Sequence, residues 1–138
     1  MNDLPDNNQD EARRWVGQAS DDLESARHQL TRDDLPARLS CFLAHLAAEK
    51  ALKAMLIALA VPFKKTHDLI ELARMLVAAG RPVEFEEARL KRLNPWVIEG
   101  RYADNLAEAS RALAVELIEI ADDIVSGIGR ALMRNKDA

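Results

Sequence analysis

The sequence is poor in the residues that build disulfide-rich or β-rich folds. Its 138 residues include one cysteine, five glycines, five prolines and 4% aromatic residues. The single cysteine, Cys41, excludes an internal disulfide and suits a reducing compartment, so we expect it to be a small buried residue. Runs of β-branched and aromatic residues are missing, whereas the strong helix formers Ala, Leu, Glu and Arg dominate. The composition therefore predicts an all-helical chain.

The chain also lacks a long apolar run and an excess of basic charge. The longest weakly charged stretch, Ala51 to Val61, is too short to cross a bilayer and contains Lys53. No basic start followed by an apolar segment marks a signal peptide. The net charge of −4 argues against an electrostatic grip on nucleic acid by the whole chain, although a local basic patch remains open. We therefore expect a cytoplasmic protein without a membrane segment.

Signatures of metal and cofactor binding are missing as well. The three histidines lie far apart in the sequence and no cysteine pair exists, so no metal site is expected. Neither a glycine-rich phosphate loop nor a dinucleotide-binding fingerprint is present, so no cofactor is expected.

Apolar residues recur at steps of three and four residues over most of the chain, which is typical of amphipathic helices. The pattern predicts helices over about 10–30, 36–60, 66–80 and 106–133, and a weaker one over 84–93. Pro36 suits the first turn of the second helix, and Thr66 is the expected cap of the third. The stretch from Trp96 to Asp104 reads as a loop.

These segments predict one helical domain over residues 9–134, with a disordered tail over 1–8 and a short tail over 135–138. The second helix is apolar on most sides, which places it at the centre. An all-α, up-down antiparallel bundle of four to five helices is the simplest packing. Trp15 and Trp96 are the expected core or interface anchors.

A polar stripe interrupts this central helix. His45, Glu49 and Lys53 recur at steps of four and share one face, where they can pair. One interpretation is a solvated or internally hydrogen-bonded strip. The other is a ligand-binding cleft in a dimer, with this stripe as its floor and Arg101 and Tyr102 as its roof.

A second polar cluster lies at the start of the third predicted helix. His67 and Asp68 are expected to cap this helix and fix the preceding loop. The alternative is that Lys64, Lys65 and the helix N-terminus bind an anion such as phosphate.

Four segments share their order with the motifs of one family. They are 22–26 (DLESA), 47–53 (AAEKALK), 65–69 (KTHDL) and 101–104 (RYAD). Together they resemble the HEPN domain over about residues 15–130, with Ala103 in place of the usual proline. The resemblance implies a bundle of four or five helices, commonly a homodimer. It also implies partnership with a minimal nucleotidyltransferase, sometimes as a toxin–antitoxin pair.

Some HEPN branches are metal-independent ribonucleases, and the resemblance implies where their motif should lie. They use an Arg and a His separated by four to six residues near the start of the last helix. Here the candidate is Arg101, but residues 106–108 at that spacing are Leu, Ala and Glu. Arg38 and His45 have six residues between them and form a second candidate pair. The weak catalytic candidates are therefore Arg38, His45 and Arg101.

The sequence thus favours a dimeric binding subunit for nucleotide or RNA that partners a minimal nucleotidyltransferase. The expected ligand-binding residues are His45, Glu49, Lys53, Arg101 and Tyr102. In relatives from toxin–antitoxin pairs, a tyrosine beside the Arg motif can be modified with nucleotide, which makes Tyr102 a candidate acceptor. The alternatives are a metal-independent ribonuclease toxin and a phosphorelay bundle with His45 as phosphoacceptor.

Overall fold

The computed structural model describes residues 4–81, 86–97 and 108–137, with side chains described from residue 7 to residue 134 of those ranges. Every regular element in these ranges is helical, which confirms the all-α prediction. The elements are α1 (Leu4–Leu30), α2 (Ala37–Ala58), α3 (Leu69–Ala78), α4 (Glu87–Leu93), the 3-10 turn η1 (Asn94–Trp96) and α5 (Arg111–Asp137).

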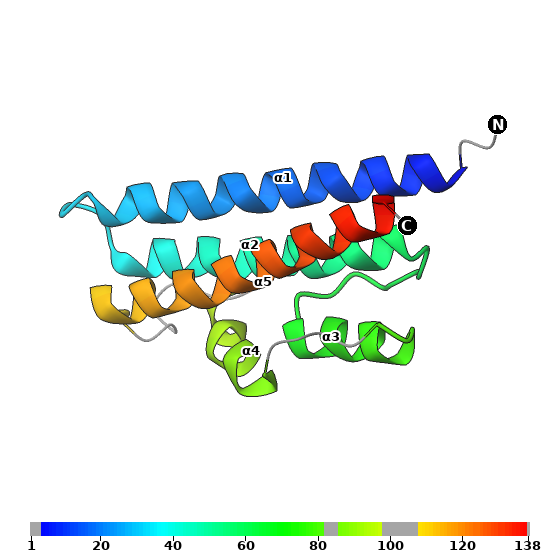
Figure 1. The fold of residues 1–138 in the computed structure, drawn as a ribbon. Helices are drawn as coiled ribbons and strands as arrows, with labels where there is room; N and C mark the ends of the chain where they lie inside the picture. The colour runs from blue at the N-terminus through cyan, green and yellow to red at the C-terminus, as the bar shows by residue number, and fades with distance from the viewer. Residues whose placement is uncertain (1–3, 82–85, 98–107, 138) are drawn as a thin grey trace.

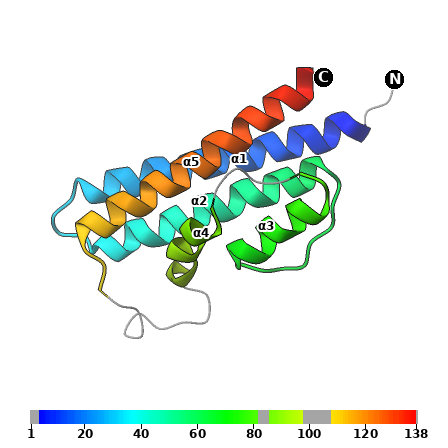
Figure 2. The same ribbon diagram turned by 60° about the horizontal axis from the view of Figure 1, so that its bottom comes forward.

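Three long helices lie side by side and form the bundle (Figure 1). The helix α1 runs antiparallel to both α2 and α5, and it packs most extensively on α2. The short helices α3 and α4 pack on α2 and on each other, outside the three long helices (Figure 2). The segment that contains α3 and α4 returns the chain to the end of the bundle where α2 begins. The last helix, α5, therefore runs in the same direction as α2. The central helix therefore has neighbours on nearly every side.

The burial pattern explains this arrangement. One stripe of α1 is buried, whereas α2 is buried around most of its circumference, as its apolar sequence predicts. The α2 residues buried from solvent are Ser40, Cys41, Ala44, His45, Ala47, Ala48, Glu49, Ala51, Leu52, Lys53, Ala54, Met55 and Leu56. Cys41 and Trp96 are buried, and Trp15 is half-buried against the core, which confirms these three predictions.

The ends of the first and last helices differ from the predicted ones. Residues 1–8 are predicted to be a tail, but α1 begins at Leu4. Pro5 is compatible with this start because the first turn of a helix needs no backbone N–H partner. At the other end of the chain α5 continues to Asp137, through most of the predicted tail over 135–138.

The start of α5 is also later than the predicted residue 106. Residues 108–110 are not helical, and the first helical residue is Arg111. The Ser110 hydroxyl accepts a hydrogen bond from the backbone N–H of Leu113 at 3.0 Å. Ser110 therefore caps the helix, a local signal that the apolar periodicity does not carry.

Of the residues predicted to cap the third helix, the structure confirms Asp68 and not Thr66. Asp68, not Thr66, accepts the backbone N–H groups of Ile70 and Glu71, and Thr66 accepts the N–H of Asp68 instead. The carboxylate is the better cap because it also meets the positive end of the helix dipole.

The connection between α2 and α3 begins with a left-handed residue. Ala60 has φ of 57°, and the backbone N–H of Val61 reaches back to the carbonyl of Leu56 at 2.9 Å. This geometry ends α2 and turns the chain so that the connection runs back along the helix.

Exposed ion pairs join the short helices to the bundle and to each other. Arg92 pairs with Glu116 of α5 at 2.6 Å, and Arg74 of α3 pairs with Glu87 of α4 at 3.2 Å. Within the described ranges no helix has the length and apolar character that a bilayer crossing requires.

Candidate functional site

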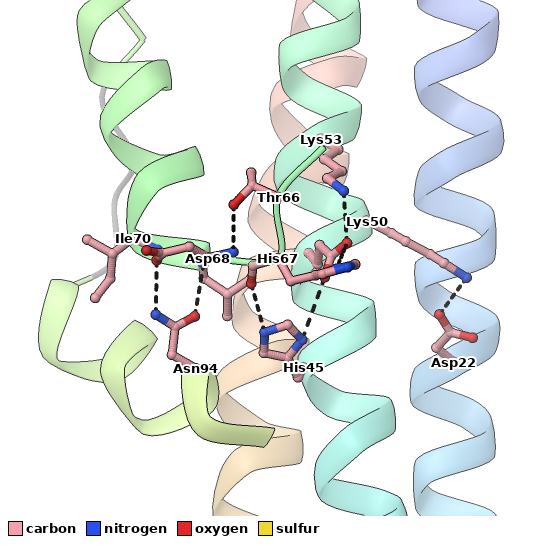
Figure 3. A network of polar contacts seen from close by, with 11 residues as sticks. Asp22, His45, Lys50, Lys53, Thr66, His67, Asp68, Ile70 and Asn94 are labelled. Carbon is pink, nitrogen blue, oxygen red and sulfur yellow. Dashed lines mark hydrogen bonds and ion pairs between the residues drawn. The ribbon is translucent and has the colours of Figure 1, made fainter. Parts of the chain in front are cut away.

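The predicted polar stripe is buried inside the molecule. His45, Glu49 and Lys53 are 0%, 4% and 7% exposed, although all three carry polar side chains. The connection over residues 59–68 lies across them, and Figure 3 shows His67 of that connection pointing toward the stripe. The stripe is therefore internally hydrogen-bonded and not solvated, whereas the interpretation as the floor of a ligand-binding cleft in a dimer stays a prediction.

Glu49 is the centre of the polar network. Its carboxylate accepts a hydrogen bond from Lys53 Nζ at 2.9 Å and from His67 Nδ1 at 2.9 and 3.0 Å to its two oxygens (Figure 3). The ammonium of Lys53 also lies 5.7 Å from the ring centre of Phe63, within range of a cation–π interaction. The buried carboxylate is thus neutralised and held between α2 and the connection that covers it.

His45 is fixed in one tautomer by its backbone partner. Its Nε2 lies 3.1 Å from the carbonyl oxygen of His67, and a carbonyl only accepts, so Nε2 carries the proton. Burial lowers the pKa of His45 to about 4, which keeps the ring neutral at pH 7. Its Nδ1 is therefore a bare acceptor, 3.7 Å from Oε1 of Glu49. Among the described residues Nδ1 has no hydrogen-bond partner.

A second set of hydrogen bonds fixes the start of α3. The Asn94 amide donates to Asp68 Oδ1 at 3.0 Å, and its oxygen accepts the backbone N–H of Leu69 at 2.9 Å. The hydrogen bond from Asn94 also holds the pKa of Asp68 below its ordinary value. This clamp joins η1 to the residue that follows His67, so the two segments that flank the network are tied together.

A cleft of about 440 Å³ opens beside the network. Its lining residues are Phe42, His45, Leu46, Glu49, Lys65, His67 and Val97. The walls are therefore apolar, the floor carries the Glu49 carboxylate and two imidazoles, and one lysine lies among the lining residues. A site with apolar walls and a few convergent polar groups is typical of small-molecule binding.

The structure brings together some of the predicted site residues and not others. His45, Glu49 and Lys53 share one network, and the first two line the cleft. Arg101 and Tyr102, the predicted roof, lie outside the described residues. Arg38 is half-buried in the first turn of α2, and no hydrogen bond joins it to His45 in the described part of the chain. The catalytic role of these residues stays a prediction.

Other residues of the site are missing from the predicted set. His67 is predicted only as part of a helix start, although its side chain binds the Glu49 carboxylate. Lys64 and Lys65 are predicted together as anion ligands, but Lys64 pairs with Glu71 at 3.4 Å and only Lys65 lines the cleft. In the ranges described, no group of three or more His, Cys, Asp or Glu side chains could hold a metal ion.

Comparisons with known proteins agree with this architecture. The archaeal HEPN homologue ST0689 superposes with a TM-score of 0.66 and 25% identity, covering 88% of this chain and 97% of its own. The protein TT1696 from Thermus thermophilus superposes with a TM-score of 0.67 and 26% identity, covering 86% of this chain and 96% of its own. The search of curated proteins gives no match.

The family assignment rests on most of the chain. The sequence model of the HEPN domain matches residues 12–130, a range that holds the network, the cleft and all but the ends of α1 and α5. The two structural neighbours share the fold over nearly their full length. The chain therefore belongs to the HEPN domain family.

Proposed function

We propose that this chain is a HEPN subunit that binds a nucleotide, free or at an RNA end, in the cleft beside Glu49. In this proposal the subunit acts as a cytoplasmic homodimer and partners a minimal nucleotidyltransferase. The single observation that carries the binding role is the cleft itself, where a buried polar floor meets apolar walls and a lysine.

The charges around the cleft support an anionic ligand. The Glu49 carboxylate is already paired with Lys53, so the floor presents no uncompensated negative charge. Lys65 lines the cleft, is exposed, and forms no ion pair within the described residues. A phosphate at Lys65 would gain a charge-assisted hydrogen bond, although the chain as a whole carries a net charge of −4.

The apolar walls of the cleft favour a ligand with a flat ring next to the phosphate. Phe42, Leu46 and Val97 are half-buried and face the same space as the polar floor. Unstacked bases are commonly recognised by stacking on apolar or aromatic side chains combined with hydrogen bonds to their edges. A nucleotide therefore matches both the walls and the floor, whereas an inorganic anion would use only Lys65.

The state of His45 favours binding over the ribonuclease alternative. Its ring is buried, it donates its proton to a backbone carbonyl, and its pKa is lowered to about 4. A general acid or base works best with a pKa near the working pH and access to the reacting oxygen. We therefore assign His45 to the floor of a binding site.

Calorimetry with adenosine and uridine monophosphates tests the binding role. We expect saturable binding that weakens about tenfold in Lys65→Ala, because a charge-assisted contact to phosphate is lost. Lys64→Ala is the matched control, since Lys64 is the preceding residue and pairs with Glu71. Absence of binding by either nucleotide, or equal loss in both variants, would overturn the proposal.

The partnership is tested by co-purification. A tagged chain expressed with a nucleotidyltransferase encoded beside it should recover a complex of fixed stoichiometry. Co-expression should also relieve any growth defect if the pair forms a toxin–antitoxin system. Recovery of the tagged chain alone would remove the transferase from the proposal and leave the binding role to calorimetry.

A further inference from the structure

Arg38, in the first turn of α2, has no part in the network of Glu49. It is half-buried, and it forms no hydrogen bond or ion pair with any residue that the structure describes. The nearest carboxylate in the sequence, Asp34, pairs with Arg32 at 2.8 Å. A guanidinium presents a fork of donors that matches the oxygens of a phosphate, and without an anion those donors stay unused. The surroundings of Arg38 therefore favour an anionic ligand.

The helical repeat places Arg38 on the face of α2 that lines the cleft. The lining residues from this helix are Phe42, His45, Leu46 and Glu49. With 3.6 residues per turn they occupy an arc of about 100° around the helix axis. Arg38 lies inside that arc, about 20° from His45 in angle, and it precedes Phe42 by about 6 Å along the axis. The cleft face of α2 therefore continues to Arg38, one turn beyond the lining residues.

The other cation near the cleft, Lys65, lies toward the opposite end. The connection over residues 59–68 runs back along α2, and its His67 binds Glu49. Lys65 precedes His67, so it lies level with Glu49 or farther from the start of α2. Arg38 is separated from Glu49 by about 16 Å along the helix axis. The two cations therefore lie toward opposite ends of the cleft, with the Phe42 wall between them.

We propose that Arg38 binds a second phosphate, so that the cleft takes a nucleotide of an RNA strand and not a free mononucleotide. The inference rests on the proposed function and assigns the strand as its ligand. A nucleotide in a strand carries a phosphate on each side of its sugar, whereas a free monophosphate carries one. In this arrangement the base lies against Phe42, and the two phosphates meet Lys65 and Arg38.

Three adenosine ligands test the second phosphate in the unmodified protein. Adenosine monophosphate carries one phosphate, adenosine diphosphate carries two on the same side of the sugar, and adenosine 3′,5′-bisphosphate carries one on each side. We expect the bisphosphate to bind about tenfold more tightly than the monophosphate in calorimetry, because it adds a charge-assisted contact with Arg38. The diphosphate should gain about threefold or less, because its second phosphate meets no fixed cation.

The outcomes separate this inference from the proposed function. Equal affinity of the bisphosphate and the monophosphate would overturn the inference and leave the proposed function standing. A diphosphate that binds as tightly as the bisphosphate would also overturn it, since the position of the second phosphate would then not matter. Binding of none of the three would overturn both.

Two arginine variants assign the second phosphate to a residue. In Arg38→Ala the advantage of the bisphosphate over the monophosphate should shrink to about twofold or less, since the added contact is lost. Arg130→Ala is the matched control, because Arg130 of α5 is exposed and also forms no hydrogen bond or ion pair within the described residues. It removes the same charge and should keep the advantage. An advantage that survives in Arg38→Ala, or that falls equally in both variants, would contradict the assignment.

Discussion

Two faces of α2 are buried by different means. The face toward α1 is marked by Ser40, whose hydroxyl donates to the carbonyl of Ala26 at 2.8 Å. By helical spacing it shares that face with Ala47, Ala51 and Ala54, all fully buried. The face toward the connection over residues 59–68 carries the network of Glu49 instead. Small residues allow one helix to approach closely, whereas charges require a partner for every group.

The contrast separates the part of α2 that holds the fold from the part that holds the site. Burial of apolar side chains stabilises the folded state without specific partners. Burial of an ion pair costs the solvation free energy of both charges, and their mutual attraction barely offsets this cost. A charged network that persists in a core is therefore poor evidence for stability and better evidence for function. Variants of one face can thus be judged against variants of the other.

Removal of the Glu49 carboxylate should have the largest effect. Glu49→Ala leaves the ammonium of Lys53 buried without its anion, and we expect a loss of about 3–5 kcal/mol in the free energy of unfolding. Lys50→Ala breaks the pair with Asp22 of α1, whose side chains are 24% and 17% exposed, and should cost about 1 kcal/mol or less. Urea denaturation measures both. Losses of equal size would show that the two faces do not differ.

The response to pH should be the second largest effect. The folded pKa of His45, about 4, lies below its value of 6.5 in the unfolded chain, so the unfolded state binds the proton first. Stability from this group is complete above pH 6.5 and is lost as the pH falls toward 4. Between pH 7 and pH 5 we expect a loss of about 2 kcal/mol in denaturation experiments.

Two histidine variants assign this pH dependence. His45→Phe should remove the slope between pH 7 and pH 5. His28→Ala replaces an exposed histidine of α1 and should preserve it. A slope that survives in His45→Phe would place the titrating group elsewhere.

Overpacking the α1 face should cost stability and spare the cleft. Ala51 is fully buried, so Ala51→Leu inserts methyl groups into a close contact and should cost about 1–3 kcal/mol. The affinity for adenosine monophosphate should stay within about twofold once the protein is folded. A large loss of affinity with intact folding would mean that the faces are coupled.

The clamp between Asp68 and Asn94 should give the smallest effect, and it can be exchanged. Asn94→Asp places two carboxylates together and should cost about 1 kcal/mol. In the double variant Asp68→Asn with Asn94→Asp, Oδ1 at position 68 still has to accept the N–H groups of Ile70 and Glu71, so the new amide can face the carboxylate at position 94 only by weakening the cap, and it should recover only part of that loss. Thermal denaturation of the four proteins gives the coupling energy. Additive losses in the double variant would show that the pair does not interact.

The sequence predicted the fold well because periodicity reports burial directly. The central position of α2 follows from its apolar circumference, and the structure confirms it. The helix ends were predicted less well, because they depend on single side chains such as Ser110, and because both Thr66 and Asp68 are plausible caps of α3 in the sequence. Serine and aspartate occur in several kinds of turn as well as at helix starts. Which of them caps a helix therefore depends on the path of the backbone.

The site was predicted only along one helix. The step of four residues predicts that His45, Glu49 and Lys53 share a face, and the structure confirms this. It cannot predict that His67 reaches Glu49 across 18 positions, because that contact depends on how the connection crosses α2. The motif over residues 65–69 identifies this segment but does not predict where its side chains point.

The central claim is that the charged face of α2 forms the floor of a nucleotide site and that its alanine face does not. Titration of isotope-labelled protein with adenosine monophosphate, followed by amide and side-chain NMR, tests it most directly. The account predicts saturable shifts at Phe42, His45, Glu49 and His67, with Ala47 and Ala51 much less affected. Shifts confined to the α1 face, or no shifts at millimolar nucleotide, would contradict it.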